Sequence, residues 1–200
     1  EKKIQHIRAT YRRVLALPVK DLPFDCAEAD FTGSFQQRVE GGQLVWARYD
    51  VGYAHGSSGF ELLMDGGQVL FVLTHADSWH FDVDSDLPET PAGQQSPTVD
   101  SVHQERYYFE GDTVLRALQK SALARSVKEE KIDAQLDAAV NEPIPKPDGP
   151  KVLQEARAIA AAKPSTSVES PPSASLRTQC SIWMPGTGRR YGRSVWARRP

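Results

Sequence analysis

The sequence lacks the features that mark membrane, metal-thiolate or nucleic-acid-binding proteins. Its apolar runs, such as Val69 to Leu73, are far shorter than the roughly 18 residues of a membrane-spanning helix. Cys26 and Cys180 are the only cysteines, and without a CxxC motif they do not indicate a zinc site. The formal net charge of -2 over 200 residues argues against a chain that binds nucleic acid through its folded part. We therefore expect no membrane span and no nucleic-acid partner for that part.

The beginning of the chain and the cysteines bear on the compartment. The sequence starts Glu1-Lys2-Lys3, without Met and without an apolar segment, which is typical of a processed, exported protein or of a fragment. We therefore expect a periplasmic or secreted location. Cys26 and Cys180 could form a disulfide in such a compartment; the alternative is that Cys26 is a small buried hydrophobe beside Phe24.

Hydrophobic periodicity predicts an N-terminal helix followed by an antiparallel sheet. In residues 2–16 apolar side chains recur every three or four positions, as on one face of a helix, and Pro18 ends the pattern. From residue 31 to residue 81 the period becomes that of strands. Gly41-Gly42 and Gly66-Gly67 separate apolar runs and predict two tight hairpins.

Six strands are expected between residues 32 and 118. The apolar run from Val69 to Leu73 is typical of a strand covered on both faces, and the N-terminal helix is the expected cover of one face. The fold class is thus predicted to be α+β: an N-terminal helix packed on an antiparallel β-meander of about six strands, followed by C-terminal helices and a disordered tail. The expected strands are 32–40, 43–53, 60–65, 69–73, 103–109 and 113–118, with a loop at 84–100.

The second half of the chain predicts a helical extension and a basic tail. Ser126 and Glu129 have the spacing of a capping box and predict a helix that reaches Val140. Four prolines between residues 143 and 150 indicate a stiff linker before a short helix at 151–162. The expected organisation is a helix-plus-sheet domain over 1–120, a helical extension over 121–163 and a disordered tail over 164–200.

The tail differs in charge from the rest of the chain. Residues 164–200 hold six arginines and one glutamate, a net charge of +5, which leaves -7 on residues 1–163. Aromatic residues between these arginines could contact single-stranded nucleic acid or an anionic surface. The alternative is a non-native extension, which would explain why its composition resembles nothing upstream.

A cluster of imidazoles and carboxylates follows the apolar strand, at His75, Asp77, His80 and Asp82. Such side chains suit a divalent transition metal. Successive strand residues point to opposite faces, so His75 and Asp77 share one face and His80 and Asp82 the other. The two pairs would meet only if the chain bends near Ser78-Trp79. With that bend, His75, His80 and Asp82 would centre a metal-dependent hydrolase. Without it, they are polar residues at the end of a strand.

Aromatic residues recur along the expected strands and could form a ligand platform if they are not simply core. The segment Gly56-Ser57-Ser58-Gly59 lacks the Gly-x-Ser-x-Gly spacing of a nucleophilic serine. The sequence therefore favours a non-catalytic exported binding or accessory module, with no cofactor, whose partner is an unknown protein or a small apolar ligand. Its oligomeric state stays open. The candidate ligand-binding residues are Trp46, Tyr49, Tyr53, Tyr107 and Tyr108.

One short motif resembles a known family. Residues 37–41, Gln-Arg-Val-Glu-Gly, have the Gln-x-Val-x-Gly form of the first inhibitory loop of cystatins, and like that loop they follow a helix and lie at an expected hairpin turn. The resemblance implies an inhibitor of papain-like cysteine proteases, with Gln37, Val39 and Gly41 in the protease cleft. The chain departs from the family in having Gly66-Gly67 where cystatins carry Pro-Trp in the second hairpin.

A longer stretch resembles uncharacterised exported bacterial proteins. It begins with a helix of the Ile-Arg-Ala-Thr-Tyr type at residues 7–11 and includes a late Glu-Arg-Tyr-Tyr-Phe-Glu-Gly element at residues 105–111. The resemblance covers Ile7 to about Leu118. It implies a helix-plus-meander fold and a periplasmic or secreted location, and it attaches no chemistry.

Overall fold

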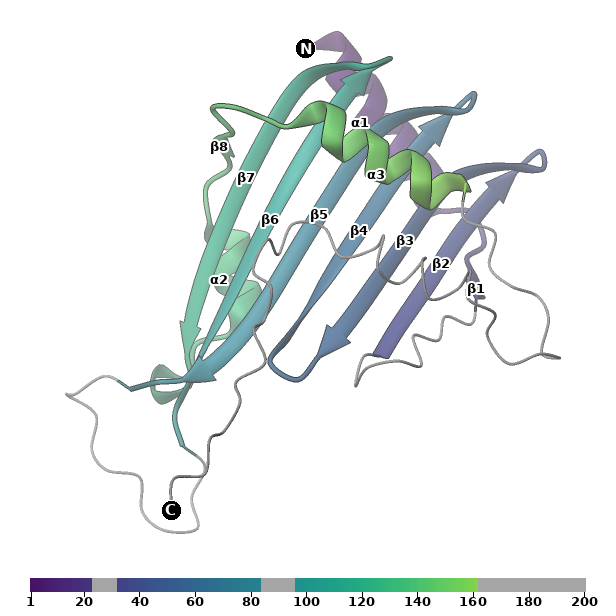
Figure 1. Ribbon diagram of the computed structural model, residues 1–200. Coiled ribbons are helices and arrows are strands. Elements are labelled where there is room, and N and C mark those ends of the chain that lie inside the picture. Colours follow the sequence, from purple (N-terminus) through teal and green to yellow (C-terminus); the bar gives the residue numbers. More distant parts are fainter. Residues whose placement is uncertain (23–31, 84–95, 162–200) are drawn as a thin grey trace, which may run out of the picture. The chain divides into compact units, whose positions relative to one another are not determined.

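The computed structural model of the chain describes residues 1–22, 32–83 and 96–161 (Figure 1). All of them belong to one compact unit, residues 1–166. Three expectations lie outside the described residues: the state of Cys26 and Cys180, most of the loop at 84–100, and the tail from residue 164.

The centre of this unit is an eight-stranded antiparallel sheet whose strands follow one another in chain order. The α+β class and the helix-plus-meander arrangement are confirmed. The number of strands is eight rather than six, because two short strands at the sheet edges, β1 and β8, pair with the expected six. The strands are β1 (Lys20–Leu22), β2 (Thr32–Glu40), β3 (Gln43–Tyr53), β4 (Gly56–Asp65), β5 (Gln68–Phe81), β6 (Thr98–Glu110), β7 (Thr113–Arg125) and β8 (Glu142–Pro143).

Tight glycine turns join the central strands. Gly41 and Gly42 have φ angles of +58° and +80°, and Gly66 and Gly67 have φ angles of +53° and +78°. Glycine adopts this left-handed region without steric cost, and two such residues fit the twist of a hairpin. Both predicted hairpins are thus confirmed. β5, β6 and β7 extend well beyond their expected ends, because their distal residues show no regular apolar signal.

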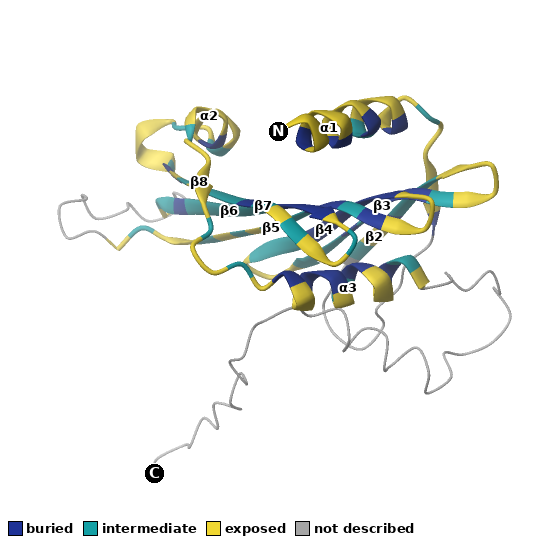
Figure 2. Ribbon diagram, turned by 90° about the horizontal axis from the view of Figure 1, so that it is seen from above, coloured by how far each residue is buried: buried dark blue, intermediate teal, exposed yellow. Residues whose placement is uncertain are grey.

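Helices cover both faces of the sheet near these turns (Figure 2). α1 (Lys2–Leu15) buries Ile4, Ile7 and Val14 against a core that includes Leu63 and Phe71. It is the cover that the sequence predicted. α3 (Gly149–Ala161) lies on the opposite face and buries Val152, Leu153, Ala156 and Ile159.

The helix expected from Ser126 to Val140 is wrong in extent. A 3-10 turn, η1 (Ser126–Lys128), and a separate short helix, α2 (Ile132–Ala138), take its place. Glu129 has a φ angle of +54°, which ends the first turn, and Ser126 Oγ accepts the N–H of Thr98 at 2.8 Å. Ser126, predicted to cap a helix, therefore accepts a hydrogen bond from β6 instead.

α2 lies on the α1 face, so the chain must pass around the edge of the sheet to reach α3 (Figure 2). It does so through β8, which pairs with β7, and through Ile144, whose N–H donates to the carbonyl of Ala117 at 3.1 Å. Asp148 then begins α3, because its carboxylate accepts the N–H of Lys151 at 3.2 Å. None of the helices in the described ranges is both long and apolar enough to cross a membrane.

Candidate functional site

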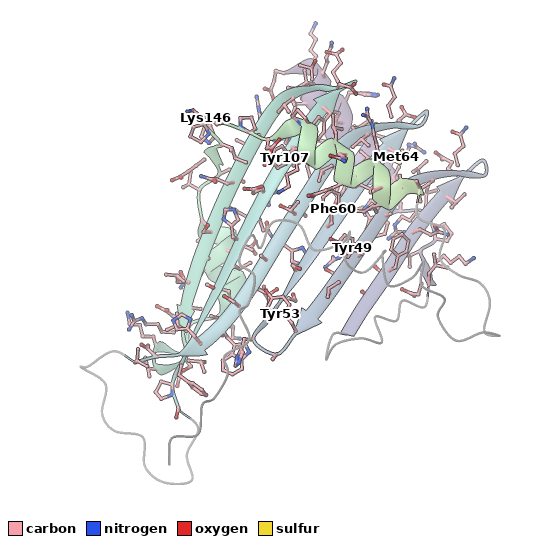
Figure 3. The ribbon with its side chains drawn as sticks, in the orientation of Figure 1. Tyr49, Tyr53, Phe60, Met64, Tyr107 and Lys146 are labelled. Carbon is pink, nitrogen blue, oxygen red and sulfur yellow. The ribbon has the colours of Figure 1, made fainter. Side chains whose placement is uncertain are left out.

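The five candidate aromatic residues are divided between the two faces of the sheet. Trp46 and Tyr108 belong to the core under α1. Tyr107 and Tyr108 are consecutive strand residues, so Tyr107 faces α3 instead, as do Tyr49 and Tyr53 (Figure 3). Only 2–6% of the surface of Trp46, Tyr49, Tyr107 and Tyr108 is exposed, against 38% for Tyr53. Tyr53 is therefore the one member of the set that reaches an open surface.

Trp46 is held in a hydrogen-bond network beneath α1. Its indole N–H donates to Glu61 Oε1 at 2.7 Å, and the hydroxyl of Tyr11, on α1, donates to the same oxygen. Glu61 is itself buried, so these donors supply the partners that a buried carboxylate needs. Burial, assisted by Glu61, raises the pKa of Tyr11 and keeps its hydroxyl protonated as a donor. The network joins helix to sheet and explains the burial of Trp46.

Tyr53 borders an open hollow of about 410 Å³ on the α3 face. The covered half of this face carries large side chains such as Phe60 and Tyr107, which fill the space beneath α3 (Figure 3). The open half carries small side chains such as Ala76, Ser78 and Ser101 between larger ones, and these small side chains leave the hollow. Residues that line it include Tyr53, Ser78, Ser101, His103, Ser121 and Leu123.

Strand register brings these lining residues together. Ser78 on β5 is opposite Ser101 on β6, and their hydroxyls are 2.8 Å apart. His103 is opposite Ser121 on β7, and Ser101 is opposite Leu123. None of these five residues was a candidate from the sequence. The distal parts of β5, β6 and β7 carry polar residues on both faces, so their sequence shows no period that would mark a site.

The phenol of Tyr53 forms a fixed wall of the hollow. Its hydroxyl lies 3.3 Å from the carbonyl oxygen of Ser57 and 3.2 Å from that of Asp77, and it donates toward both. The side chain of Asp77 itself points to the other face, where it accepts a hydrogen bond from Ser57 Oγ. Hydroxyl groups, an imidazole and apolar atoms thus line the hollow, and the carboxylate of Asp77 points away from it.

A row of hydrogen bonds runs from the hollow toward α3. Ser121 Oγ lies 2.8 Å from His103 Nδ1, and His103 Nε2 lies 3.4 Å from Glu105 Oε1. Tyr107 donates its hydroxyl to Glu105 Oε2 at 2.8 Å, and burial, followed by this carboxylate, raises the pKa of Tyr107.

The setting of this row does not favour acyl transfer at Ser121. The hydroxyl stands in the interior of a strand, where backbone N–H groups lie in the plane of the sheet and do not converge on a point above it. Stabilisation of an oxyanion requires such convergent donors. The arrangement is therefore better suited to binding than to nucleophilic catalysis.

The predicted metal cluster is not brought together. β5 stays extended to Phe81, so the bend expected near Ser78-Trp79 is absent. His75 and His80 consequently point to opposite faces, and Asp82 pairs with Arg125 at 3.2 Å. Over residues 1–22, 32–83 and 96–161, no group of three His, Cys, Asp or Glu residues is placed to hold a metal ion.

His75 belongs instead to an ion-pair network on the α1 face. Its Nε2 lies 3.1 Å from Asp50 Oδ1, while Arg48 Nε and Nη2 donate to the two oxygens of Asp50 at 2.7 and 3.1 Å. Burial by itself would raise the pKa of Asp50, but the hydrogen bonds from His75 and Arg48 outweigh it and hold that pKa below its usual range. A Cβ at Gly59 would collide with His75 and Asp50, so glycine makes room for this pair.

The cystatin-like motif forms the β2–β3 hairpin as expected. Gly41 begins the turn with its positive φ angle, and Val39 is exposed beside it. Gln37 is only half exposed, because it pairs with Ala47 on β3 and Lys20 on β1. The entry of these residues into a protease cleft stays a prediction.

Comparisons with protein-family models, with curated proteins and with solved structures found no match to this chain.

Proposed function

We propose that the protein is a non-catalytic binding or accessory module whose ligand occupies the open hollow beside Tyr53. The observation that carries this proposal is a hollow of about 410 Å³ on a sheet face whose other half is filled by core side chains. Pockets of roughly 300–1,000 Å³ accommodate small organic molecules. The periplasmic or secreted location stays a prediction from the sequence.

The lining supports a small, mainly apolar ligand with one or two hydrogen-bonding groups. Leu123 and Ala76 offer apolar surface, whereas the hydroxyls of Ser78 and Ser101 can both donate and accept hydrogen bonds. No Lys or Arg lines the described part of the hollow, which favours a neutral molecule over an anion.

The proposal is tested by filling the hollow in the full-length chain. The probe is p-cresol, a small apolar molecule with one hydroxyl, and binding is followed by NMR titration. Ser121→Trp places an indole in the hollow, while Thr113→Trp adds the same bulk at an exposed position at the other end of β7. Ser121→Trp is expected to weaken cresol binding by about tenfold or more, equivalent to roughly 1.4 kcal/mol, and Thr113→Trp to leave it unchanged.

Two results would reject this site. One is the absence of cresol binding to the unmodified chain. The other is equal weakening by both tryptophan variants, because that would place the probe elsewhere on the protein.

A protease inhibitor is the second candidate, favoured by the exposed Val39 beside the Gly41 turn. It predicts stoichiometric inhibition of a papain-like protease by the intact chain and loss of inhibition in Gly41→Trp. An intact chain that does not inhibit the protease rejects this function. That outcome would not bear on the p-cresol site, because the two experiments test different surfaces.

A further inference from the structure

Two half-buried cations lie next to each other on the α1 face, and both are held by uncharged groups. Arg106 donates from Nη1 to Asn141 Oδ1 at 2.6 Å and from Nη2 to Gln104 Oε1 at 3.1 Å. Lys120 Nζ donates to the backbone carbonyl of Leu136, on α2, at 2.9 Å. Gln104 is opposite Lys120 in the register, which makes Arg106 and Lys120 diagonal neighbours on β6 and β7.

This pair differs from two other partly enclosed arginines on the same face, whereas a third, Arg38, resembles it in donating to a backbone carbonyl, that of Leu17. Arg48 pairs with Asp50, and Arg116 pairs with Glu1 at 2.6 Å. In the part of the chain that the structure describes, neither Arg106 nor Lys120 forms an ion pair with a carboxylate. Partial burial of a cation without a counter-charge costs free energy, which a bound anion would offset.

The electrostatics of Lys120 point in the same direction. Burial lowers the pKa of Lys120, and the positive charge of Arg106 lowers it further. Asp137, on α2, acts in the opposite sense but does not reverse the effect. The positive charge of Arg106 therefore acts on Lys120 more strongly than this nearby carboxylate does.

The two side chains retain donors for a ligand. A guanidinium carries five N–H donors and an ammonium three. Arg106 uses two of its five and Lys120 one of its three, so each keeps more than one N–H for an oxyanion. Arg106 also lies between Leu73 and Leu118 in the register, and both leucines pack against the α1 core. The site thus combines a fork of donors with an apolar flank, on the side of the sheet where α1 and α2 lie (Figure 2).

We propose that Arg106 and Lys120 form a binding site for a small organic carboxylate. The carboxylate accepts hydrogen bonds from both cations, and the short apolar part of the ligand lies along Leu73 and Leu118. The site is on the opposite face from the hollow at Tyr53, so it does not depend on the function proposed above.

The test is calorimetric titration of the full-length protein with sodium butyrate, and with inorganic phosphate in a parallel series. Arg106→Gln and Lys120→Gln are each expected to weaken butyrate binding by about tenfold. Arg116→Gln, on the same face but already paired with Glu1, serves as the matched control and should change it less than about twofold. Arg106→Lys keeps the charge and should retain part of the affinity even if the glutamine variant disturbs Asn141.

Three results would overturn the assignment: no butyrate binding, butyrate binding unchanged in both glutamine variants, or binding of phosphate without butyrate. The last would assign the cation pair to phosphate instead. Because p-cresol carries no carboxylate at neutral pH, the butyrate and cresol titrations report separately on the two faces.

Discussion

The sheet half near the glycine turns and the half beyond it are built from the same strands but differ in what they carry. Near the turns, α1 and α3 cover both faces, and Leu62, Leu63 and Val72 are fully enclosed. Farther along β5, Ala76, Ser78 and His80 are exposed on the α3 face. A strand can therefore serve as core in one half and as a binding surface in the other, because α3 excludes water from its face of the sheet only in the first half.

The largest expected effect separates the two halves by stability. Leu62→Ala removes a buried side chain from the covered half and should lower the free energy of unfolding by about 2–5 kcal/mol. Leu123→Ala removes the same atoms from a side chain that is 63% exposed. It should change the free energy of unfolding by less than about 0.5 kcal/mol. Urea denaturation measures both values. Similar losses for both variants would contradict the division into core and binding surface.

A smaller effect is expected at Gly59, between the two halves. Gly59→Ala places a Cβ against the His75 and Asp50 side chains and should lower the free energy of unfolding by about 1–3 kcal/mol. His75→Ala removes the imidazole that the new Cβ would meet. Gly59→Ala should therefore lower the free energy of unfolding less in the His75→Ala variant than in the unmodified chain. Thermal denaturation of the four proteins completes the cycle. Strict additivity would show that Gly59 does not accommodate His75.

The Asp50 network predicts a pH dependence of stability. The pKa of Asp50 is lowered in the folded protein, so its contribution is fully present above the unfolded value of about 4 and is lost as pH falls through the lower folded value. Asp50→Asn should therefore destabilise the protein at pH 7, and its stability should begin to converge with that of the unmodified chain below about pH 4 and match it only below the folded pKa. Unfolding curves from pH 2 to pH 7 test this. A difference that stays constant over that range would contradict the stated role of His75 and Arg48.

The smallest expected effect concerns the wall of the hollow. Tyr53→Phe removes the hydroxyl that donates toward the carbonyls of Ser57 and Asp77, and should lower the free energy of unfolding by about 0.5–1.5 kcal/mol. Tyr53→Ala removes the ring as well and should additionally weaken cresol binding. Equal cresol affinity in the phenylalanine and alanine variants would exclude the ring from the binding surface.

The elements that could be predicted from the sequence carry local signals. The α1 helix shows its apolar face every three or four residues, and Gly41-Gly42 and Gly66-Gly67 identify their own turns. β1 and β8 have three and two residues, too few to show a period. The helix expected to start at Ser126 is interrupted at Glu129, and Ser126 bonds to the N–H of Thr98, a contact between segments distant in sequence.

The candidate site was less accessible to prediction because it depends on register and burial. The aromatic residues were visible, but periodicity alone did not show that Trp46 would bind Glu61 beneath α1. Ser78 and Ser101 carry no signal by themselves, and only their pairing across β5 and β6 places them together. Arg106 and Lys120 likewise become a pair only through the register of β6 and β7 and through α2.

Amide chemical-shift changes on titration of the 200-residue chain with p-cresol locate the ligand site directly. We expect the largest changes at Ser78, Ser101 and Ser121, on the open half of the α3 face, and little change at Trp46 and Leu63 beneath α1. The absence of cresol-dependent changes, or a maximum beneath α1, would contradict the proposal that the hollow beside Tyr53 is the ligand site.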